Sequence, residues 1–437
     1  MNRKEAEDFV YKSYLKAEPH LNYDDPDAKK RNPDLTKEII RNLSQTPCVL
    51  ITGSKGKGST AAMISEILQT EYRVGLMTSP HIARFNERFR VNGEEISDEE
   101  LTEHINEIAP AIKAIDAGIK EDEYVSPIGI QAIVALNYFD DSDTDFNVFE
   151  CGKGVRYDDV KNITHQYAVI NTIFPEHTRE LGNTLEEIAA DKSHIISGNE
   201  RCVYIAAQEA EVMDVLLKRA KERGVPAKIY GRDFYAQNIG FTDGGMTFDV
   251  VLKEKTIRDI RLPLLGEHQA RNCALALAMC RDELKVFDEE RIKEKLNSMR
   301  WPGRMEIIRR EPLTILDACI NEESCQNVIK VLNELKIDRV VSIVGIPDDK
   351  DYLGVLRCIA PYSKKVILTR SSNPHYRFTG LQKETAARNG LDVVSTLSLK
   401  EARMIAETYR RPILILGTTS LISDAVCLYK KEKDQLC

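Results

Sequence analysis

The sequence predicts an α/β fold of two domains, each built on a parallel sheet, with a β-rich insertion in the first. Apolar runs of strand length alternate with helical segments along most of the chain. This alternation is typical of a parallel sheet covered by helices on both faces. A turn-rich stretch at 228–264 interrupts the alternation, which starts again after Trp301. We therefore expect domains at 1–300 and 301–437.

The individual elements follow from the positions of the apolar residues. Residues 1–45 are charged and predict helices, with a turn at NYDDPDAKKRNPD. The strands expected in the first domain are PCVLITG, RVGLMTS, DFNVFECG, YAVINTI and RCVYIAA. The helices expected there are STAAMISEILQTEY, SDEELTEHINEIAPAIKAI, PIGIQAIVALNYFDD, TLEEIAADKSHII and EHQARNCALALAMCRDEL. The strands expected in the smaller, Rossmann-like domain are LTILDA, RVVSIVG, KKVILT, LDVVST and PILILG.

The composition narrows the class of protein. With 61 basic and 69 acidic residues, the net charge of −8 argues against a nucleic-acid partner. The ten cysteines include no Cys-x-x-Cys pair, and no Cys/His spacing predicts a zinc site. The N-terminal stretch is too charged for a signal peptide, and no apolar run is long enough to span a membrane. We expect a cytoplasmic protein with no membrane partner, either monomer or dimer.

The stretch CVLITGSKGKGST, residues 48–60, joins an apolar strand to a helix through a glycine-rich turn. In this context a P-loop binds phosphates, because backbone N–H groups and the positive end of the helix face the anion. The usual pattern ends Gly-Lys-Ser/Thr, whereas Gly58 here separates Lys57 from the hydroxyl residues. Lys57 would reach the terminal phosphates, while Ser59 or Thr60 would ligate Mg²⁺. We expect the helix to begin near Ser59.

Several polar residues lie where predicted strands end. Glu150 and Asp317 each close an apolar run, and carboxylates at such positions point into the crevice where ligands bind. Each could equally be an ordinary solvated acid. His177 follows another strand, where a lone histidine is more often structural. Lys192 and Arg304, taken alone, would be unremarkable surface residues.

Taken in order, a series of segments resembles folylpolyglutamate synthase and its dihydrofolate synthase relatives, within the Mur ligase family. GSKGKGS resembles the family's GTNGKGS loop, in which the same extra glycine occurs. The resemblance covers the chain from about residue 40 onward. The other segments that carry it are TSPHIARFNERFRVNGEEIS, FECGKG, EHTRELGNTLEEIAADKSHII, GEHQARNCALALA, RWPGRMEII, ILDACINEES, GIPDDKDYLGVL and PILILGTTSLISDA.

The resemblance implies an ATP-dependent ligase that joins an amino acid to a small-molecule acid. ATP would phosphorylate the acid, and the amine would attack the acyl phosphate and release ADP and phosphate. ATP and Mg²⁺ are the implied cofactors. The enzyme would have to neutralise the triphosphate and hold the amine in line.

The resemblance also implies roles for particular residues. Ser59, Glu150 and His177 would surround magnesium, and Lys192 matches a lysine that the family carbamylates. Lys57, Lys192 and His177 would be the catalytic residues. The residues implied in nucleotide binding are Gly53, Ser54, Gly56, Lys57, Gly58, Ser59, Thr60, Asn272 at the adenine, Arg304 at the phosphates, and Asp317.

The chain departs from the family pattern at several positions. The family's DGAHNP is DACINE here, so that Ile320 stands in place of the histidine. GLGGRLDATN is replaced by CGKGVRYDDVKN at 151–162, and the aspartate before the magnesium histidine is Glu176. These departures favour a relative that acts on a different acid or amino acid. Two rival hypotheses are a nucleotide-binding protein that has lost ligation and a P-loop NTPase switch.

Overall fold

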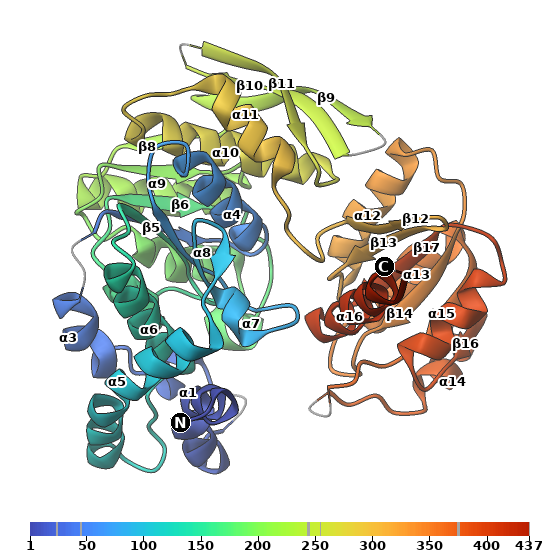
Figure 1. Cartoon of the computed structure of the whole chain (residues 1–437), viewed down its shortest axis with the longest axis horizontal. Helices are drawn as coiled ribbons and strands as arrows, with labels where there is room; N and C mark the ends of the chain where they lie inside the picture. The colour runs from blue at the N-terminus through green and yellow to red at the C-terminus, as the bar shows by residue number, and fades with distance from the viewer. Residues whose placement is uncertain (23–24, 44–45, 243–244, 254, 374–375, 437) are drawn as a thin grey trace.

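The computed structural model describes residues 1–22, 25–43, 46–242, 245–253, 255–373 and 376–436 (Figure 1). The chain forms three sheets, one in each of the three regions expected from the sequence. The predicted turn at 22–34 lies partly outside the described residues, because 23 and 24 are not described. Within the described ranges, no helix is long and apolar enough to cross a membrane.

The largest sheet has eight strands in the order β4-β3-β2-β5-β1-β6-β7-β8. The central strands are parallel, as predicted, and pair β5 with β1 and β1 with β6. The fully buried pattern of β1 explains its continuous apolar sequence. The strands are β1 (Cys48–Thr52), β2 (Val74–Met77), β3 (Phe89–Val91), β4 (Glu94–Glu95), β5 (Phe146–Glu150), β6 (Tyr167–Ile170), β7 (Cys202–Ile205) and β8 (Ala227–Ile229).

The edge formed by β3 and β4 differs from the expected all-parallel sheet. These two strands run antiparallel to their neighbours. Asn92 and Gly93 connect them with φ angles of 50° and 85°, the left-handed values of a tight hairpin turn. The Asn-Gly pair is a hairpin signal, but the flanking strands are too short to show an apolar period.

Side chains of each central strand alternate between two cores. Val49 and Ile51 of β1 enter one core, whereas Cys48 and Leu50 enter the other. The first core also contains α4 (Lys57–Leu68) and α10 (Glu267–Glu283). The second contains α1 (Arg3–Ala17), α3 (Asp34–Asn42), α5 (Asp98–Gly118), α6 (Pro127–Asp141), α8 (Leu185–Lys192) and α9 (Ala210–Arg223). The short helices α2 (Asp27–Lys30) and α7 (Thr178–Leu181) lie in connections.

The turn-rich stretch forms a separate antiparallel sheet in the order β11-β10-β9. Its strands are β9 (Phe234–Thr242), β10 (Gly245–Leu252) and β11 (Lys255–Leu262). Buried residues of β10 such as Phe248 and Val250 pack into the same core as α10. The predicted β-rich insertion is therefore confirmed, and it covers α10 and α11 (Glu289–Ser298).

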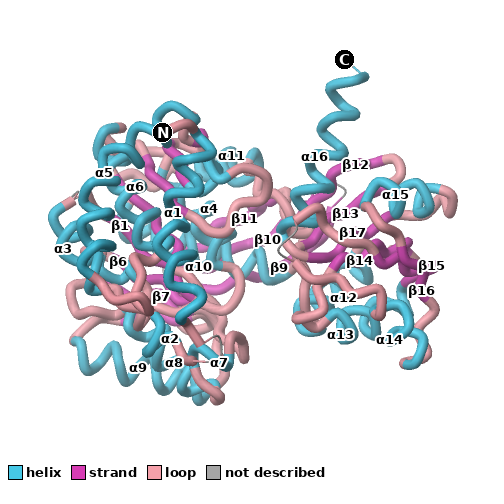
Figure 2. Tube along the Cα trace, turned by 90° about the horizontal axis from the view of Figure 1, so that it is seen from below, coloured by secondary structure: helices cyan, strands magenta, loops and turns pink. Residues whose placement is uncertain are grey.

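The second α/β sheet contains six strands in the order β12-β13-β17-β14-β15-β16 (Figure 2). Helices cover both of its faces, with α12, α13 and α14 on one side and α15 and α16 on the other. Only β12 is antiparallel among its described pairings. Its strands are β12 (Glu306–Arg310), β13 (Leu313–Asp317), β14 (Val340–Gly345), β15 (Ser363–Leu368), β16 (Val393–Ser395) and β17 (Ile413–Gly417). Its helices are α12 (Glu322–Glu334), α13 (Tyr352–Ile359), α14 (Gln382–Arg388), α15 (Leu399–Glu407) and α16 (Thr419–Leu436).

Candidate functional site

The glycine-rich loop runs between β1 and α4. Helix α4 begins at Lys57, two residues before the expected start, and Gly56 precedes it with a left-handed φ of 83°. Gly53 has a φ of 139°, and a Cβ added there would lie 2.6 Å from the Cβ of Asn171. Glycine is therefore required at both positions by backbone conformation, and at Gly53 also by close packing. The loop directs the positive end of α4 toward one cavity.

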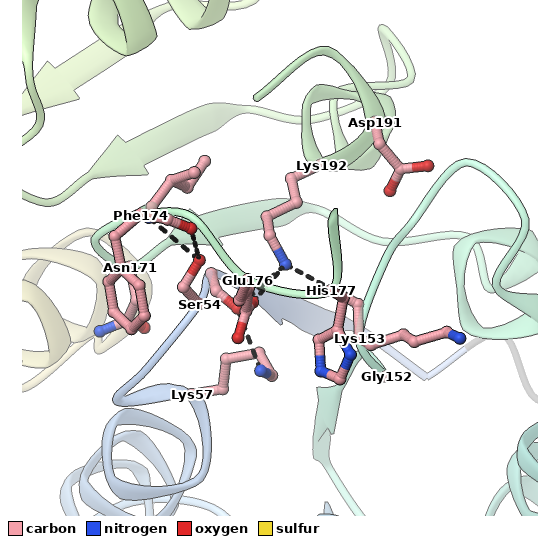
Figure 3. Close-up of polar contacts among 12 residues, drawn as sticks. Ser54, Lys57, Gly152, Lys153, Asn171, Phe174, Glu176, His177, Asp191 and Lys192 are labelled. Carbon is pink, nitrogen blue, oxygen red and sulfur yellow. Dashed lines mark hydrogen bonds and ion pairs between the residues drawn. The ribbon is translucent and has the colours of Figure 1, made fainter. Parts of the chain in front are cut away.

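Two lysine ammonium groups meet at the carbonyl oxygen of Gly53 (Figure 3). Lys57 Nζ donates to it at 3.0 Å and Lys192 Nζ at 3.3 Å. Lys192 also donates to the Lys153 carbonyl at 2.5 Å and pairs with Glu176 Oε1 at 3.1 Å. The Lys192 side chain is fully buried, so it is not a surface lysine. Burial lowers the pKa of Lys192, although the Glu176 carboxylate opposes this shift.

The extra glycine of the loop allows two side chains to approach the start of α4. A Cβ added to Gly58 would lie 3.2 Å from Glu150 Oε2 and 3.3 Å from Trp301 Cζ2. Arg90 lies over the indole of Trp301, with its Cζ atom 5.4 Å from the ring centroid. Gly58 is therefore the place where the loop, the end of β5 and the segment between α11 and β12 come together.

Glu150 and Ser59 supply oxygen atoms on the α4 side of the cavity. Glu150 is buried and accepts a hydrogen bond from the Ser79 amide at 2.9 Å. Burial raises the pKa of Glu150, and the nearby Lys57 ammonium opposes the rise. Thr60 is fully buried and its hydroxyl accepts from Asn171 Nδ2 at 3.0 Å. Of the two hydroxyl residues, Ser59 lines the cavity.

His177 lies on the loop after β6 and has a left-handed φ of 48°. Its side chain is 46% exposed, and Nδ1 lies 3.9 Å from Glu180 Oε2. Burial of part of the ring lowers the pKa of His177, although Glu176 opposes the shift. The lowered pKa favours the neutral imidazole, which has a lone pair that can bind a metal ion.

Helix α10, beside the loop, and the segment around β13 complete the lining of the cavity. Asn272 accepts a hydrogen bond from Asn171 Nδ2 at 2.9 Å. Asp317 Oδ2 accepts from the Met305 amide at 2.9 Å. Burial raises the pKa of Asp317, and the charges of Arg304 and Lys55 oppose the rise. The two lysines of the loop thus differ. The charges of Arg304 and Asp317 act on Lys55, whereas Lys57 donates a hydrogen bond to the Gly53 carbonyl of its own loop.

These residues surround one cavity of about 430 Å³. Gly53, Thr60 and Lys192 lie behind its lining, where they hold the loop in place. The sequence did not indicate Asn171 or Gln269, because both act through hydrogen bonds with distant segments: Asn171 with Thr60 and Asn272, and Gln269 with Ser59. The predicted residues that line the cavity are Ser54, Gly56, Lys57, Gly58, Ser59, Glu150, His177, Asn272, Arg304 and Asp317.

A second cavity, of about 460 Å³, lies between the segment after β2 and the second α/β sheet. Pro80, His81 and Ile82 line it, and the same residues line a small pocket that also reaches Gly58 and Glu150. This segment therefore stands between the two larger cavities. The other lining residues are Tyr11, Ala83, Arg88, Ser372, Asn373, Tyr376, Thr419, Ser420, Ser423 and Asp424.

The altered segment at 151–162 is held by buried acids. Asp158 Oδ2 accepts from the Gly152 amide at 2.7 Å, and Asp159 Oδ1 accepts from the Thr36 hydroxyl at 2.6 Å. Burial raises the pKa of Asp159 to about 6, although the Arg31 guanidinium opposes the rise. These acids connect the segment to the N-terminal helices, which gives the Asp-Asp pair a structural role.

Comparison with known proteins gives consistent results for sequence and structure. The Mur ligase middle domain model matches residues 51–280. The dihydrofolate synthase/folylpolyglutamate synthase of Bacillus subtilis is 29% identical over 390 residues, which cover 86% of this chain and 88% of that protein. Folylpolyglutamate synthase of Mycobacterium tuberculosis, complexed with ADP and AMPPCP, aligns with a TM-score of 0.84 at 25% identity, covering 96% and 99% of the two chains. An FPGS–AMPPCP–folate complex aligns with a TM-score of 0.80 at 25% identity, covering 98% and 100%.

Substitution of Gly58 tests the packing at the start of α4. In Gly58→Ala, the added methyl group must displace Glu150 or Trp301, and we expect ATP to bind about tenfold more weakly or worse. Isothermal titration calorimetry with MgATP measures this change. Gly118→Ala is the control, because an added Cβ there meets no atom of the described residues within 4 Å. Equal ATP affinity in Gly58→Ala and the wild type would contradict this account.

Proposed function

The chain belongs to the Mur ligase family, and from that membership we propose its substrates, its metal ion and the roles of its site residues. It is an ATP-dependent ligase of the folylpolyglutamate synthase type, which joins a small-molecule acid to an amino acid and releases ADP and phosphate. The comparisons support this activity over a protein without ligation and over an NTPase switch.

As substrates we propose a folate-type acid and glutamate. This proposal rests on the similarity to folylpolyglutamate synthases in sequence and structure. The similarity extends over nearly the whole chain. The second cavity supports the proposal, because it is separated from the phosphate-binding loop by the single segment Pro80–Ile82. A second candidate is a different carboxylic acid, favoured by Ile320, which replaces a histidine of the family pattern in the loop before α12.

We propose that the cavity beside the loop holds MgATP. The carboxylate of Glu150 and the hydroxyl of Ser59 are hard oxygen donors of the kind that Mg²⁺ prefers. The raised pKa of buried Glu150 indicates a site that a cation would stabilise. His177 would complete this set with its neutral imidazole. When bound, the ion would neutralise negative charge on the phosphates.

The remaining predicted residues keep their proposed roles at the nucleotide. Lys57 would exchange its hydrogen bond with the Gly53 carbonyl for the terminal phosphates. Arg304 supplies a second cation from the second unit, and Asp317 of the same unit would contact the nucleotide. Asn272 would face adenine, and its hydrogen bond with Asn171 fixes its orientation.

The proposed units are residues 1–300, which bind ATP, and 301–437, which bind the amino acid. The cavity supports this division, since residues of both units line it: Lys57 and Glu150 from the first, and Arg304 and Asp317 from the second. Rotation of the second unit would close the cavity over the substrates and exclude water. We also propose a cytoplasmic location, which agrees with the nine free thiols among the described cysteines.

Carbamylation of Lys192 remains a proposal, supported by its lowered pKa. A lower pKa increases the fraction of neutral amine, and this is the form that adds CO₂. The carbamate would replace the ammonium group that pairs with Glu176 by a negative charge, so we expect the modification to form only where bound Mg²⁺ favours it. Intact-mass measurement under bicarbonate and MgATP should show the addition of one CO₂, and Lys192→Arg should not. An unchanged wild-type mass, confirmed by density for a free amine in a crystal, would contradict the proposal.

The ligase reaction can be tested by ADP release together with mass spectrometry of the products. We would combine MgATP with glutamate or other amino acids, and with folates or a panel of small carboxylic acids. We expect ADP release that requires both substrates and a product heavier by one glutamyl residue. A new amide formed with another acid, but with no folate, would establish the second candidate. ATP binding without any amide product would argue against both.

Replacement of Lys57 or His177 tests their proposed contacts with MgATP. We expect Lys57→Ala and His177→Ala each to abolish amide formation, because phosphate charge would no longer be neutralised. Lys218→Ala, at an exposed position of α9, is the control that removes a charge elsewhere. Circular dichroism should show an unchanged fold in all three. If either site variant turned over at the wild-type rate, the proposed role of that residue would be wrong.

A further inference from the structure

A group of three side chains with the chemistry of metal ligands lies outside both cavities. His104 and Glu107 are three residues apart on α5, and Asp141 is the last residue of α6. Residues with this spacing lie on the same face of a helix. The potential ligand atoms of the three side chains all lie within 4.8 Å of one another. Both helices lie on the side of the molecule away from the second α/β sheet (Figures 1 and 2).

His104 differs from the two acids in its burial. The residue is 5% exposed, whereas the side chains of Glu107 and Asp141 are 52% and 68% exposed. Its Nδ1 atom is buried and has no hydrogen-bond partner among the described residues. The ring packs against Tyr138 with centroids 5.7 Å apart, which fixes its position. A buried polar atom without a hydrogen bond is rare in folded proteins and requires an explanation.

The distances around His104 Nδ1 match those of a metal site. Nδ1 lies 3.4 Å from Glu107 Oε2 and 3.8 Å from Asp141 Oδ2. In a tetrahedral zinc site with bonds of about 2.1 Å, ligand atoms lie roughly 3.4 Å apart. The two acids would need to move little, and they are free to do so because they are exposed. An ion between the three side chains would accept the Nδ1 lone pair.

We propose that His104, Glu107 and Asp141 bind a divalent transition-metal ion such as Zn²⁺. An imidazole nitrogen with two carboxylates suits zinc better than Mg²⁺ or Ca²⁺, which prefer sites made of oxygen atoms. The exposed side of the group leaves a fourth position for water. None of the three residues lines either cavity, so the ion would connect α5 to the end of α6 and leave the chemistry to other residues. The sequence did not indicate this site, because one ligand comes from a second helix.

Titration of the chelator-treated full chain with Zn²⁺ alone tests the proposal. The double variant Glu107→Gln/Asp141→Asn removes two proposed ligands at exposed positions and leaves buried His104 in place. Glu103→Gln/Asp140→Asn removes the same charge from exposed positions on the same two helices and is the matched control. The nucleotide cavity is unchanged in both variants, so zinc bound there contributes equally to all titrations.

We expect the wild type and the control to bind one more equivalent of Zn²⁺ than the ligand variant. Substitution of residues that only support metal ligands typically weakens metal binding roughly 10–100-fold, and we expect loss of these ligands to weaken it more. Zinc should also raise the thermal unfolding midpoint of the wild type and the control, but not that of the ligand variant. Identical isotherms and midpoints for all three proteins would overturn the proposal, as would the absence of zinc binding. Either result would leave His104 Nδ1 without a metal partner, and neither would bear on ligase activity.

Discussion

The arrangement of the nucleotide cavity depends on the burial of one ammonium group, that of Lys192. Leaving a charge in the interior without partners costs several kcal/mol, so the surrounding acceptors must all be in place. These acceptors are Gly53, Lys153 and Glu176, which belong to the loops after β1, β5 and β6. The parallel sheet brings the three loops to one edge, because the carboxyl ends of its strands lie together. The ammonium group then fixes the loops relative to one another.

Most of the fold could be predicted, because buried parallel strands leave continuous apolar runs and the helices between them are long. The antiparallel β3, β4 and β12 could not, since strands of two to five residues with exposed charges carry no clear period. Pairing with neighbouring strands in the folded protein determines where such short strands form. The early start of α4 has a similar origin. Gly56 ends the loop in a left-handed conformation while Gly58 is already helical, and the sequence does not show which of the two glycines ends the loop.

Single residues of the candidate site could be proposed from the sequence, but their arrangement in space could not. The residue types and their order predicted roles for Lys57, Glu150, His177 and Asp317, and the structure brings these residues to one cavity. The residues that orient them were not identifiable. Asn171 donates from one amide group to both Thr60 and Asn272, over separations of about a hundred residues. Such long-range contacts leave no local pattern in a single sequence.

The hairpin of β3 and β4 at the edge of the sheet also affects whether copies of the protein associate through their sheets. An exposed strand edge presents unpaired N–H and C=O groups, which can recruit another chain and begin aggregation. Here the outermost strand is two residues long, and both are exposed glutamates. The opposite edge of the sheet, β8, has three residues. A large parallel sheet thus ends on both sides in strands too short, or too charged, to serve as a template for a neighbouring molecule.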